Sequence, residues 1–181
     1  MIRSEEEAKA WISSLPEADA GAVSRLEILV DLLRYENTRQ NLVSAASLEH
    51  VWQRHIIDSA QLLLHVPRGT VTSWLDLGTG AGFPGLVIAA LRPELRVTMV
   101  ESRARRIEWL NRVARELDLG SAKVAGSRLE HYQTELVDVI SARAFAPLRE
   151  LLTLASRFST SSTQWLLPKG RSAAQELSEL T

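Results

Sequence analysis

The chain contains no cysteine among its 181 residues. This absence excludes a disulfide scaffold, a thiolate zinc site, an iron–sulfur cluster and a cysteine nucleophile, because each of these needs a thiol. It also fits a protein of a reducing compartment, where disulfides are rare. The sequence therefore favours a cytoplasmic protein whose chemistry does not use thiols.

The chain also lacks a long hydrophobic run. Its longest uninterrupted apolar stretch, residues 86–91, is far shorter than the roughly 20 residues that span a bilayer. Residues 1–7 are acidic and contain no apolar segment, so they do not form a signal peptide. We therefore expect no membrane partner.

Neither sign of charge is in excess, but the charge is unevenly distributed. The net charge is −1 and the pI is about 6.4, which gives no bulk electrostatic argument for nucleic-acid binding. Residues 1–20 hold five acidic and two basic side chains, whereas residues 101–115 hold five arginines and two glutamates. A nearly neutral chain can therefore still present one basic face.

The first third of the chain predicts helices. Ser4 and Glu7 form a capping-box pattern that opens a short helix. Apolar residues at three- and four-residue steps predict a second, amphipathic helix over residues 23–35. Ser47 is predicted to cap a third helix, which residues 67–69 end.

After residue 68 the pattern changes to short apolar runs that alternate with helical periodicity. The runs predicted as strands are residues 71–77, 95–100, 122–125, 136–140 and 164–167. The predicted helices cover residues 85–91, residues 102–117 with Ser102 as cap, and two stretches that begin near Pro147 and Arg171. This alternation indicates an α/β fold with a mostly parallel sheet and helices on both faces.

The pattern divides the chain into two parts. We interpret residues 1–68 as an N-terminal helical extension packed on a core formed by residues 69–181. The length suits one domain plus a modest extension. The sequence stops within the helix predicted after the fifth strand, so we expect C-terminal closing strands to be missing.

One segment, residues 76–85, carries most of the functional information. Gly78, Gly80 and Gly82 let the loop turn sharply and let ligand atoms approach the backbone. The loop lies between a predicted strand and a predicted helix, where open α/β sheets bind ligands. Glu101, at the end of the next strand, is placed to accept hydrogen bonds from a ribose diol.

Two cofactors compete for this loop, and a turn without a ligand is a third interpretation. Residues 80–85 match the dinucleotide pattern G-x-G-x-x-G, with Glu101 at a suitable distance. Read from Asp76, the segment matches the Asp-x-Gly-x-Gly-x-Gly loop of S-adenosylmethionine (AdoMet) methyltransferases. We prefer AdoMet, because the Asp76 carboxylate suits a methionine amino group and offers nothing to a pyrophosphate. Pro84 also crowds the helix start that a pyrophosphate would need.

Five motifs occur in order along the chain. They are Asn41-Leu42-Val43, Arg54-His55-Ile56-Ile57-Asp58-Ser59, residues 76–85, Ser141-Ala142-Arg143-Ala144-Phe145-Ala146 and Lys169-Gly170. Together they resemble the RsmG (GidB, glucose-inhibited division protein B) family, from about residue 25 to the end. The resemblance implies a Rossmann-like class I AdoMet-dependent methyltransferase. It further implies N7 of one guanosine in the decoding-region (530) loop of bacterial 16S rRNA as the target.

The resemblance also implies particular site residues. Cofactor contacts in the family fall on the positions matched here by Gly78, Phe83, Leu129, Glu130 and Arg143. The glycine-loop interpretation adds Asp76, Thr79, Gly80, Gly82 and Glu101. The implied partner is 16S rRNA or the small ribosomal subunit, the implied product is S-adenosyl-L-homocysteine, and we expect a monomer without a metal.

Methyl transfer to guanine N7 places few demands on the site. N7 has a free lone pair and no proton, so the site aligns nucleophile and methyl at about 3–3.5 Å and needs no general base. The chain has no cysteine for attack on a pyrimidine, and residues 140–143 do not form the Asn/Asp-Pro-Pro-aromatic motif that holds an exocyclic amine. We therefore assign no catalytic base and name only positioning candidates, which are His55, Ser141 and Arg143.

Arg143 needs a role compatible with a positively charged product. A cation directly beside methylated N7 would oppose the reaction, so we expect Arg143 to pair with the cofactor carboxylate or with a substrate phosphate. The RNA-binding candidates are Arg54, Arg103, Arg105, Arg106 and Lys169, although arginines on an exposed helix face need no partner.

Three other functions stay open on the sequence alone. The first is an AdoMet methyltransferase acting on a small molecule or a protein. The second is a nicotinamide-dependent oxidoreductase, and the third is a non-catalytic RNA-binding assembly factor.

Overall fold

The computed structural model describes residues 2–143, 146–170 and 173–178, and within them a single sheet of five parallel strands forms the centre. The strands are β1 (Ser73–Leu77), β2 (Arg96–Glu101), β3 (Lys123–Gly126), β4 (Val139–Ala142) and β5 (Gln164–Leu166). Their order is β3-β2-β1-β4-β5. Because all the pairings are parallel, the loops after β1 and β4 open at the same carboxyl edge, and the strand order reverses direction between these two strands.

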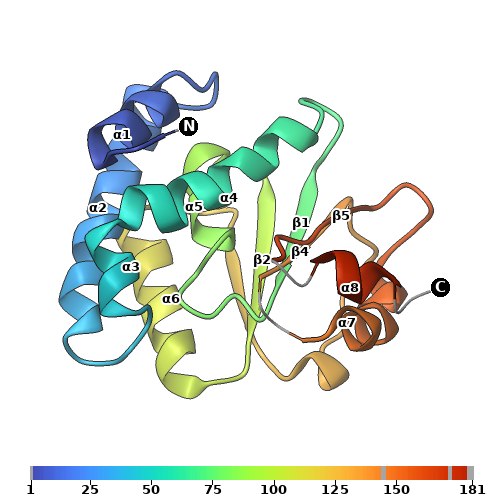
Figure 1. Ribbon diagram of the computed structural model, residues 1–181. Coiled ribbons are helices and arrows are strands. Elements are labelled where there is room, and N and C mark those ends of the chain that lie inside the picture. Colours follow the sequence, from blue (N-terminus) through green and yellow to red (C-terminus); the bar gives the residue numbers. More distant parts are fainter. Residues whose placement is uncertain (1, 144–145, 171–172, 179–181) are drawn as a thin grey trace.

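Helices cover both faces of the sheet (Figure 1). One face carries α5 (Gly85–Leu91) and α6 (Ala104–Glu116), and the other carries α7 (Leu148–Ala155). Because side chains of a strand alternate between faces, Trp74 of β1 joins one hydrophobic cluster while Leu75 and Leu77 join the other. Short helices complete this part of the chain: η3 (Leu129–His131), η4 (Ser156–Phe158) and α8 (Ala173–Ser178).

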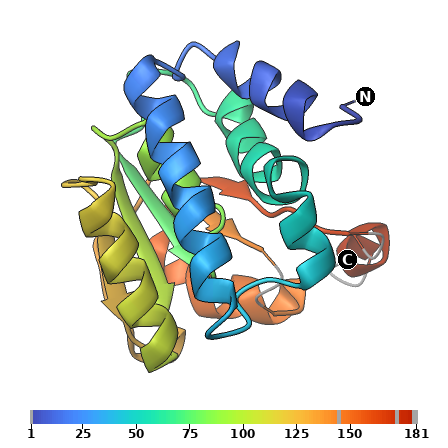
Figure 2. The same cartoon turned by 90° about the vertical axis from the view of Figure 1, so that its left-hand side faces the viewer.

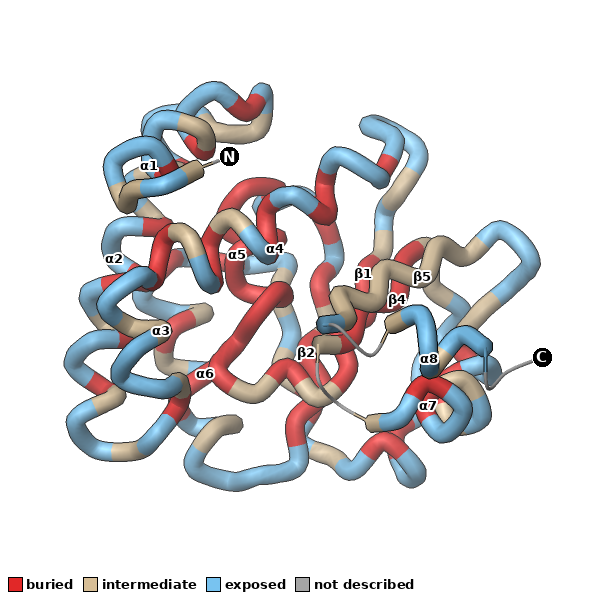
Figure 3. Tube along the Cα trace, in the orientation of Figure 1, coloured by how far each residue is buried: buried red, intermediate tan, exposed pale blue. Residues whose placement is uncertain are grey.

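The N-terminal segment is helical and packs on α5 (Figure 2). Its elements are α1 (Glu5–Ser13), α2 (Ala20–Asn37), α3 (Ala45–Glu49), the π-helix η1 (Trp52–Ile57), α4 (Asp58–Ala60) and the 3-10 helix η2 (Gln61–His65). Contacts of α2 and α4 with α5 place them in the same hydrophobic cluster as α5 and α6. The buried part of the trace accordingly includes α5 and the central strands (Figure 3). The boundary after residue 68 stays a prediction.

The predicted helix caps are partly confirmed. The hydroxyl of Ser4 accepts a hydrogen bond from the backbone N–H of Glu7, as the capping-box pattern predicts. The predicted cap at Ser47 is wrong, because α3 begins earlier and Ser44 accepts from the backbone N–H of Ser47. The single helix predicted after this cap is interrupted, since η1 and η2 have π and 3-10 geometry.

The start of α6 also differs from the prediction. Ser102 is not its cap, because the carboxylate of Glu101 accepts from the backbone N–H groups of Ser102 and Arg103 and itself satisfies them. The helix then begins at Ala104. The fourth strand begins at Val139, later than predicted.

Residues 144–145 of the fourth motif and the helix start predicted near Arg171 lie outside the described residues.

Candidate functional site

The loop between β1 and α5 has a backbone conformation that requires glycine. The φ angles of Gly78, Gly80 and Gly82 are 62°, 61° and 104°, in the left-handed region that residues with a Cβ rarely adopt. At Gly82 a Cβ atom would also lie 2.2 Å from Cδ1 of Leu86. The loop therefore presents bare backbone at the carboxyl edge of β1, where the sequence predicted a ligand.

Asp76 is fully buried at the base of this loop, and both of its oxygens are engaged. Oδ1 accepts a hydrogen bond of 2.8 Å from the Ser141 hydroxyl, and Oδ2 accepts one of 3.0 Å from the backbone N–H of Gly85. Burial raises the pKa of Asp76 to about 6. The carboxylate thus fixes the first turn of α5 to the sheet, and its predicted contact with the cofactor amino group stays a prediction.

Glu101, at the end of β2, organises the loops beside it. Its Oε2 accepts from the backbone N–H of Gly80 at 3.1 Å, while Oε1 accepts from Ser102 and Arg103 at 2.8 and 2.9 Å. A carboxylate offers about four acceptor positions. Acceptor capacity therefore remains for a ribose hydroxyl.

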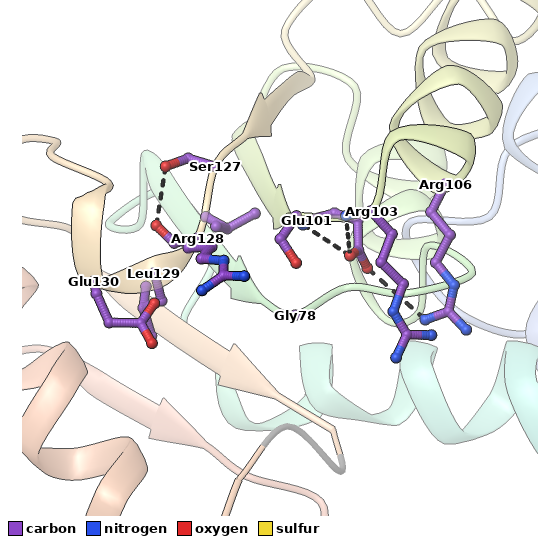
Figure 4. Close-up of a pocket in the computed structure, with 10 residues that line it drawn as sticks. Gly78, Glu101, Arg103, Arg106, Ser127, Arg128, Leu129 and Glu130 are labelled. Atoms are coloured by element: carbon purple, nitrogen blue, oxygen red, sulfur yellow. Dashed lines mark hydrogen bonds and ion pairs between the residues drawn. The ribbon is translucent and has the colours of Figure 1, made fainter.

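A cavity of about 400 Å³ lies beside Glu101 (Figure 4). Its lining residues are Gly78, Val100, Glu101, Ser102, Arg103, Arg106, Ser127, Arg128, Leu129 and Glu130. The cavity has the size of a small-molecule site and follows the ends of β1, β2 and β3. It combines a carboxylate for a ribose with apolar surface from Val100 and Leu129 for a base, which fits the adenosine half of AdoMet.

The cavity unites four of the predicted cofactor residues and omits the others. Those that meet in it are Gly78, Glu101, Leu129 and Glu130. Thr79 and Phe83 are instead buried, and Gly80 and Gly82 shape the loop without lining the cavity. Arg143 lies against Phe83, at 5.5 Å from guanidinium carbon to ring centroid.

Sequence reasoning missed some residues of the cavity and gave others a different partner. Ser127 and Arg128 follow the carboxyl end of β3, so the same edge rule that pointed to Glu101 could have found them. Arg103 and Arg106 were predicted to contact RNA, yet both line the cavity. Arg106 also lies 3.9 Å from the Glu101 carboxylate.

A second cluster joins the N-terminal segment to the carboxyl edge of the sheet. The ring of Phe83 stacks on that of His55, with centroids 4.9 Å apart and an interplanar angle of 16°. Nη1 of Arg143, just after β4, lies 3.2 Å from Nδ1 of His55. His55 comes from η1, so the N-terminal segment supplies a side chain to this edge.

The charge states of this cluster follow from its burial. Burial, together with the positive charges of Arg143 and Arg54, lowers the pKa of His55 to about 4. His55 is therefore neutral at pH 7. Burial also lowers the pKa of Arg143, while Asp76 and Asp58 act in the opposite direction. Arg143 stays a cation, because arginine keeps its proton in proteins.

The remaining RNA-binding candidates are scattered over the surface. Arg54 is exposed on η1. Lys169 forms an ion pair with Glu176, with 2.8 Å between Nζ and Oε2. Arg105 lies in a second cavity, of about 310 Å³ between α2 and α6, whose basic lining residues are Arg39, Arg105, Arg112 and Arg115.

Two kinds of feature are absent from the residues that the structure describes. No group of three or more His, Cys, Asp or Glu side chains in them is arranged to hold a metal ion. No helix among them has the length and apolar character needed to cross a membrane.

The sheet, its covering helices and the cavity at its carboxyl edge have the Rossmann-like fold of class I methyltransferases, and comparison with solved structures supports this fold. The structure of coclaurine N-methyltransferase bound to N-methylheliamine and SAH is similar in fold, with a TM-score of 0.61 and 17% identity. The similarity covers 90% of this chain and 56% of that chain. The predicted α/β fold is therefore confirmed.

Sequence relatives narrow the class to a family. A protein from Erythrobacter litoralis named ribosomal RNA small subunit methyltransferase G is 59% identical over 98% of this chain and 84% of its own length. A protein of the same name from Novosphingobium aromaticivorans is 56% identical over 97% of this chain and 77% of its own length. Residues 22–181 match the GidB family, described as rRNA small subunit methyltransferase G, and the chain belongs to this family.

Proposed function

We propose that the chain transfers a methyl group from AdoMet to N7 of a guanosine in the decoding-region (530) loop of bacterial 16S rRNA. Membership of the GidB family supports small-subunit rRNA as the substrate class. AdoMet supplies a methyl group on a positively charged sulfur, and the chain has to hold it in line with the acceptor atom.

The observation that carries the choice of N7 is that two side chains able to take a proton are already engaged: His55, which stacks on Phe83, and Asp76, at the base of the glycine loop. Nδ1 of His55 lies against the guanidinium of Arg143, and both oxygens of Asp76 accept internal hydrogen bonds. An amine or a hydroxyl acceptor has to lose a proton during the reaction, whereas guanine N7 does not. The arrangement therefore favours an acceptor with a free lone pair.

The cofactor is held by residues from four strand ends. Glu101 accepts hydrogen bonds from the ribose, Leu129 and Glu130 border the adenine, and the backbone at Gly78 allows close approach. Asp76 holds the glycine loop in place, and this loop lies beside the amino group of the methionine moiety. Arg143 pairs with the carboxylate of the same moiety, because a cation beside N7 would oppose the charge that methylation leaves on the base.

The RNA backbone is bound by basic side chains that lie outside the cofactor cavity. The cavity between α2 and α6 contributes Arg39, Arg105, Arg112 and Arg115, and Arg54 extends from η1. Opposite charge on the phosphates supports this assignment. The protein acts as a monomer in the cytoplasm, on 16S rRNA or on the small ribosomal subunit.

Transfer of labelled methyl groups tests the substrate class. The protein is incubated with methyl-labelled AdoMet and either 16S or 23S rRNA from cells that lack such an enzyme. Label is expected in 16S rRNA alone, and Gly82→Ala serves as a control with a distorted cofactor loop. Label in 23S rRNA to the same extent, or in neither RNA despite AdoMet binding, would contradict the proposal.

A further inference from the structure

We propose that Ser47 is a positioning residue that acts through the ring of His55 on the guanidinium of Arg143, and so couples the N-terminal helical segment to cofactor binding. The inference rests on the role proposed above for Arg143 as partner of the cofactor carboxylate. Ser47 lies in α3, outside the cavity and the glycine loop. Its effect on the site has to pass through other side chains.

The hydrogen bonds of the Ser47 hydroxyl determine which atom of His55 carries a proton. The hydroxyl donates its one hydrogen to the carbonyl oxygen of Ser44 at 2.9 Å. It accepts from the Ser44 hydroxyl at 3.0 Å, and its oxygen lies 3.0 Å from Nε2 of His55. A hydroxyl has one donor hydrogen and two acceptor lone pairs. Since its hydrogen is committed to Ser44, Nε2 of His55 must be the donor in the third contact.

Arg143 leads to the same tautomer from the other side of the ring. Its Nη1 and Nη2 atoms lie 3.2 and 3.3 Å from Nδ1 of His55. A guanidinium only donates, so Nδ1 must carry a lone pair. Two independent arguments therefore give a neutral His55 with its hydrogen on Nε2. The low pKa of His55, about 4, keeps this form at neutral pH.

The ring of His55 is also held in place by its surroundings. It stacks on Phe83, and the backbone carbonyl of His55 accepts a hydrogen bond of 2.6 Å from the Ser59 hydroxyl. The ring is therefore a fixed spacer between Ser47 and Arg143. Because Arg143 follows β4 and lies 88 residues from His55 in sequence, this chain of contacts links two distant parts of the molecule.

Such a link has a thermodynamic consequence. If Ser47 and His55 hold Arg143 in the orientation that the cofactor carboxylate needs, losing the Ser47 hydroxyl weakens AdoMet binding. Coupling of this kind is reciprocal, so AdoMet in turn stabilises the contact between η1 and the site. The expected loss of affinity is that of one neutral hydrogen bond, about fivefold.

Nitrogen-15 NMR of the histidine rings tests the tautomer without any activity. The His55 signal is identified by its absence in His55→Asn. At pH 7 we expect the hydrogen on Nε2 and an unprotonated Nδ1, with and without AdoMet. A hydrogen on Nδ1, or rapid averaging between the two tautomers, would overturn the proposal.

Calorimetric AdoMet titration of matched variants tests the coupling. Ser47→Ala should raise the AdoMet Kd about fivefold, and Ser47→Thr, which keeps the hydroxyl, should restore it. The control is Ser14→Ala, because the Ser14 hydroxyl likewise donates to a carbonyl three residues earlier but lies in exposed structure. This control should leave the Kd unchanged, while thermal unfolding reports any general loss of stability.

Two further variants separate this inference from the function on which it rests. His55→Asn keeps an acceptor near the position of Nδ1 and should weaken AdoMet binding less than His55→Ala. In an Arg143→Lys background, Ser47→Ala should have no additional effect on the Kd. An unchanged Kd for Arg143→Lys alone overturns the role of Arg143 and this inference together. A raised Kd for Arg143→Lys with an unchanged Kd for Ser47→Ala overturns the inference alone.

Discussion

The hydroxyl of Ser141 donates a hydrogen bond of 2.8 Å to Oδ1 of Asp76, and the two residues are register partners on the adjacent strands β4 and β1. The contact lies at the centre of the sheet, where both side chains are completely buried. Ser141 also accepts from Nε1 of Trp74 at 2.8 Å. A positioning candidate identified from the sequence is thus a part of the interior that holds the Asp76 carboxylate in place.

Ser141→Ala should destabilise the fold. The substitution leaves Nε1 of Trp74 and one oxygen of Asp76 without their partner in the interior, where each unsatisfied group costs about 1–3 kcal/mol. We expect the free energy of unfolding in urea to fall by about 3 kcal/mol. Ser159→Ala, which removes an exposed hydroxyl bonded to a backbone carbonyl, should change it by less than about 0.5 kcal/mol. Equal effects of the two substitutions would contradict the burial argument.

Asp76→Asn should reduce the pH dependence of stability. Burial raises the pKa of Asp76 to about 6, above its value in the unfolded chain, so the folded state binds the proton more tightly. The contribution of Asp76 to stability therefore falls as pH rises between about 4 and 6, and it is unfavourable at pH 7. Between pH 5 and pH 7 the wild type should lose about 1 kcal/mol more than the variant. Urea unfolding at both pH values measures this difference, and parallel pH profiles would refute the assignment.

A glycine series should separate backbone strain from steric overlap. Gly82→Ala combines a φ of 104° with a Cβ placed 2.2 Å from Leu86, so it should abolish AdoMet binding and lower the thermal midpoint strongly. Gly69→Ala meets a φ of 77° but no atom within 4 Å, and should cost about 1 kcal/mol. Gly120→Ala meets neither obstacle and should be nearly neutral. Differential scanning calorimetry gives the order of the three thermal midpoints. A Gly82→Ala variant as stable as Gly120→Ala would contradict the loop geometry.

Four arginines in and just before α6 should divide into two functional groups. Arg103→Ala and Arg106→Ala should raise the AdoMet Kd, because both side chains line the cavity beside Glu101. Arg105→Ala and Arg115→Ala should leave the AdoMet Kd unchanged and weaken rRNA binding. Each of these two substitutions should reduce the slope of log binding constant against log salt concentration by the equivalent of about one phosphate contact. Calorimetry and RNA binding at several salt concentrations distinguish the groups. An effect of all four substitutions on the same ligand would refute this division.

Much of the fold is predictable from local pattern. The five strand segments and the α5 and α6 helices follow from short apolar runs and helical periodicity, and their alternation indicates the parallel sheet. Apart from the interrupted helix at η1 and η2, the errors lie at element ends, where one side chain decides between neighbouring positions. Ser44 and Ser47 are equally good caps by residue type, and only the path of the chain selects Ser44. At α6, the Glu101 carboxylate replaces the predicted cap, Ser102.

The site is predictable where its residues follow a strand or where the family resemblance points to them. Gly78 and Glu101 are recognisable because they end β1 and β2, and Leu129 because the family resemblance points to it. The contact between His55 and Arg143 is not encoded by spacing, since it depends on how the N-terminal segment packs against the sheet. The internal role of Ser141 likewise becomes apparent only from the register of β1 and β4.

The central claim is methylation of one guanosine at N7, and chemical cleavage of the RNA tests it most directly. Small-subunit rRNA from cells lacking such an enzyme is incubated with the protein and AdoMet, then treated with borohydride and aniline, which cleave at N7-methylguanosine. The account predicts one new cleavage, in the 530 loop, that requires both protein and AdoMet and is lost in Gly82→Ala. Transfer of the methyl group without any cleavage, or cleavage elsewhere in the rRNA, would contradict it.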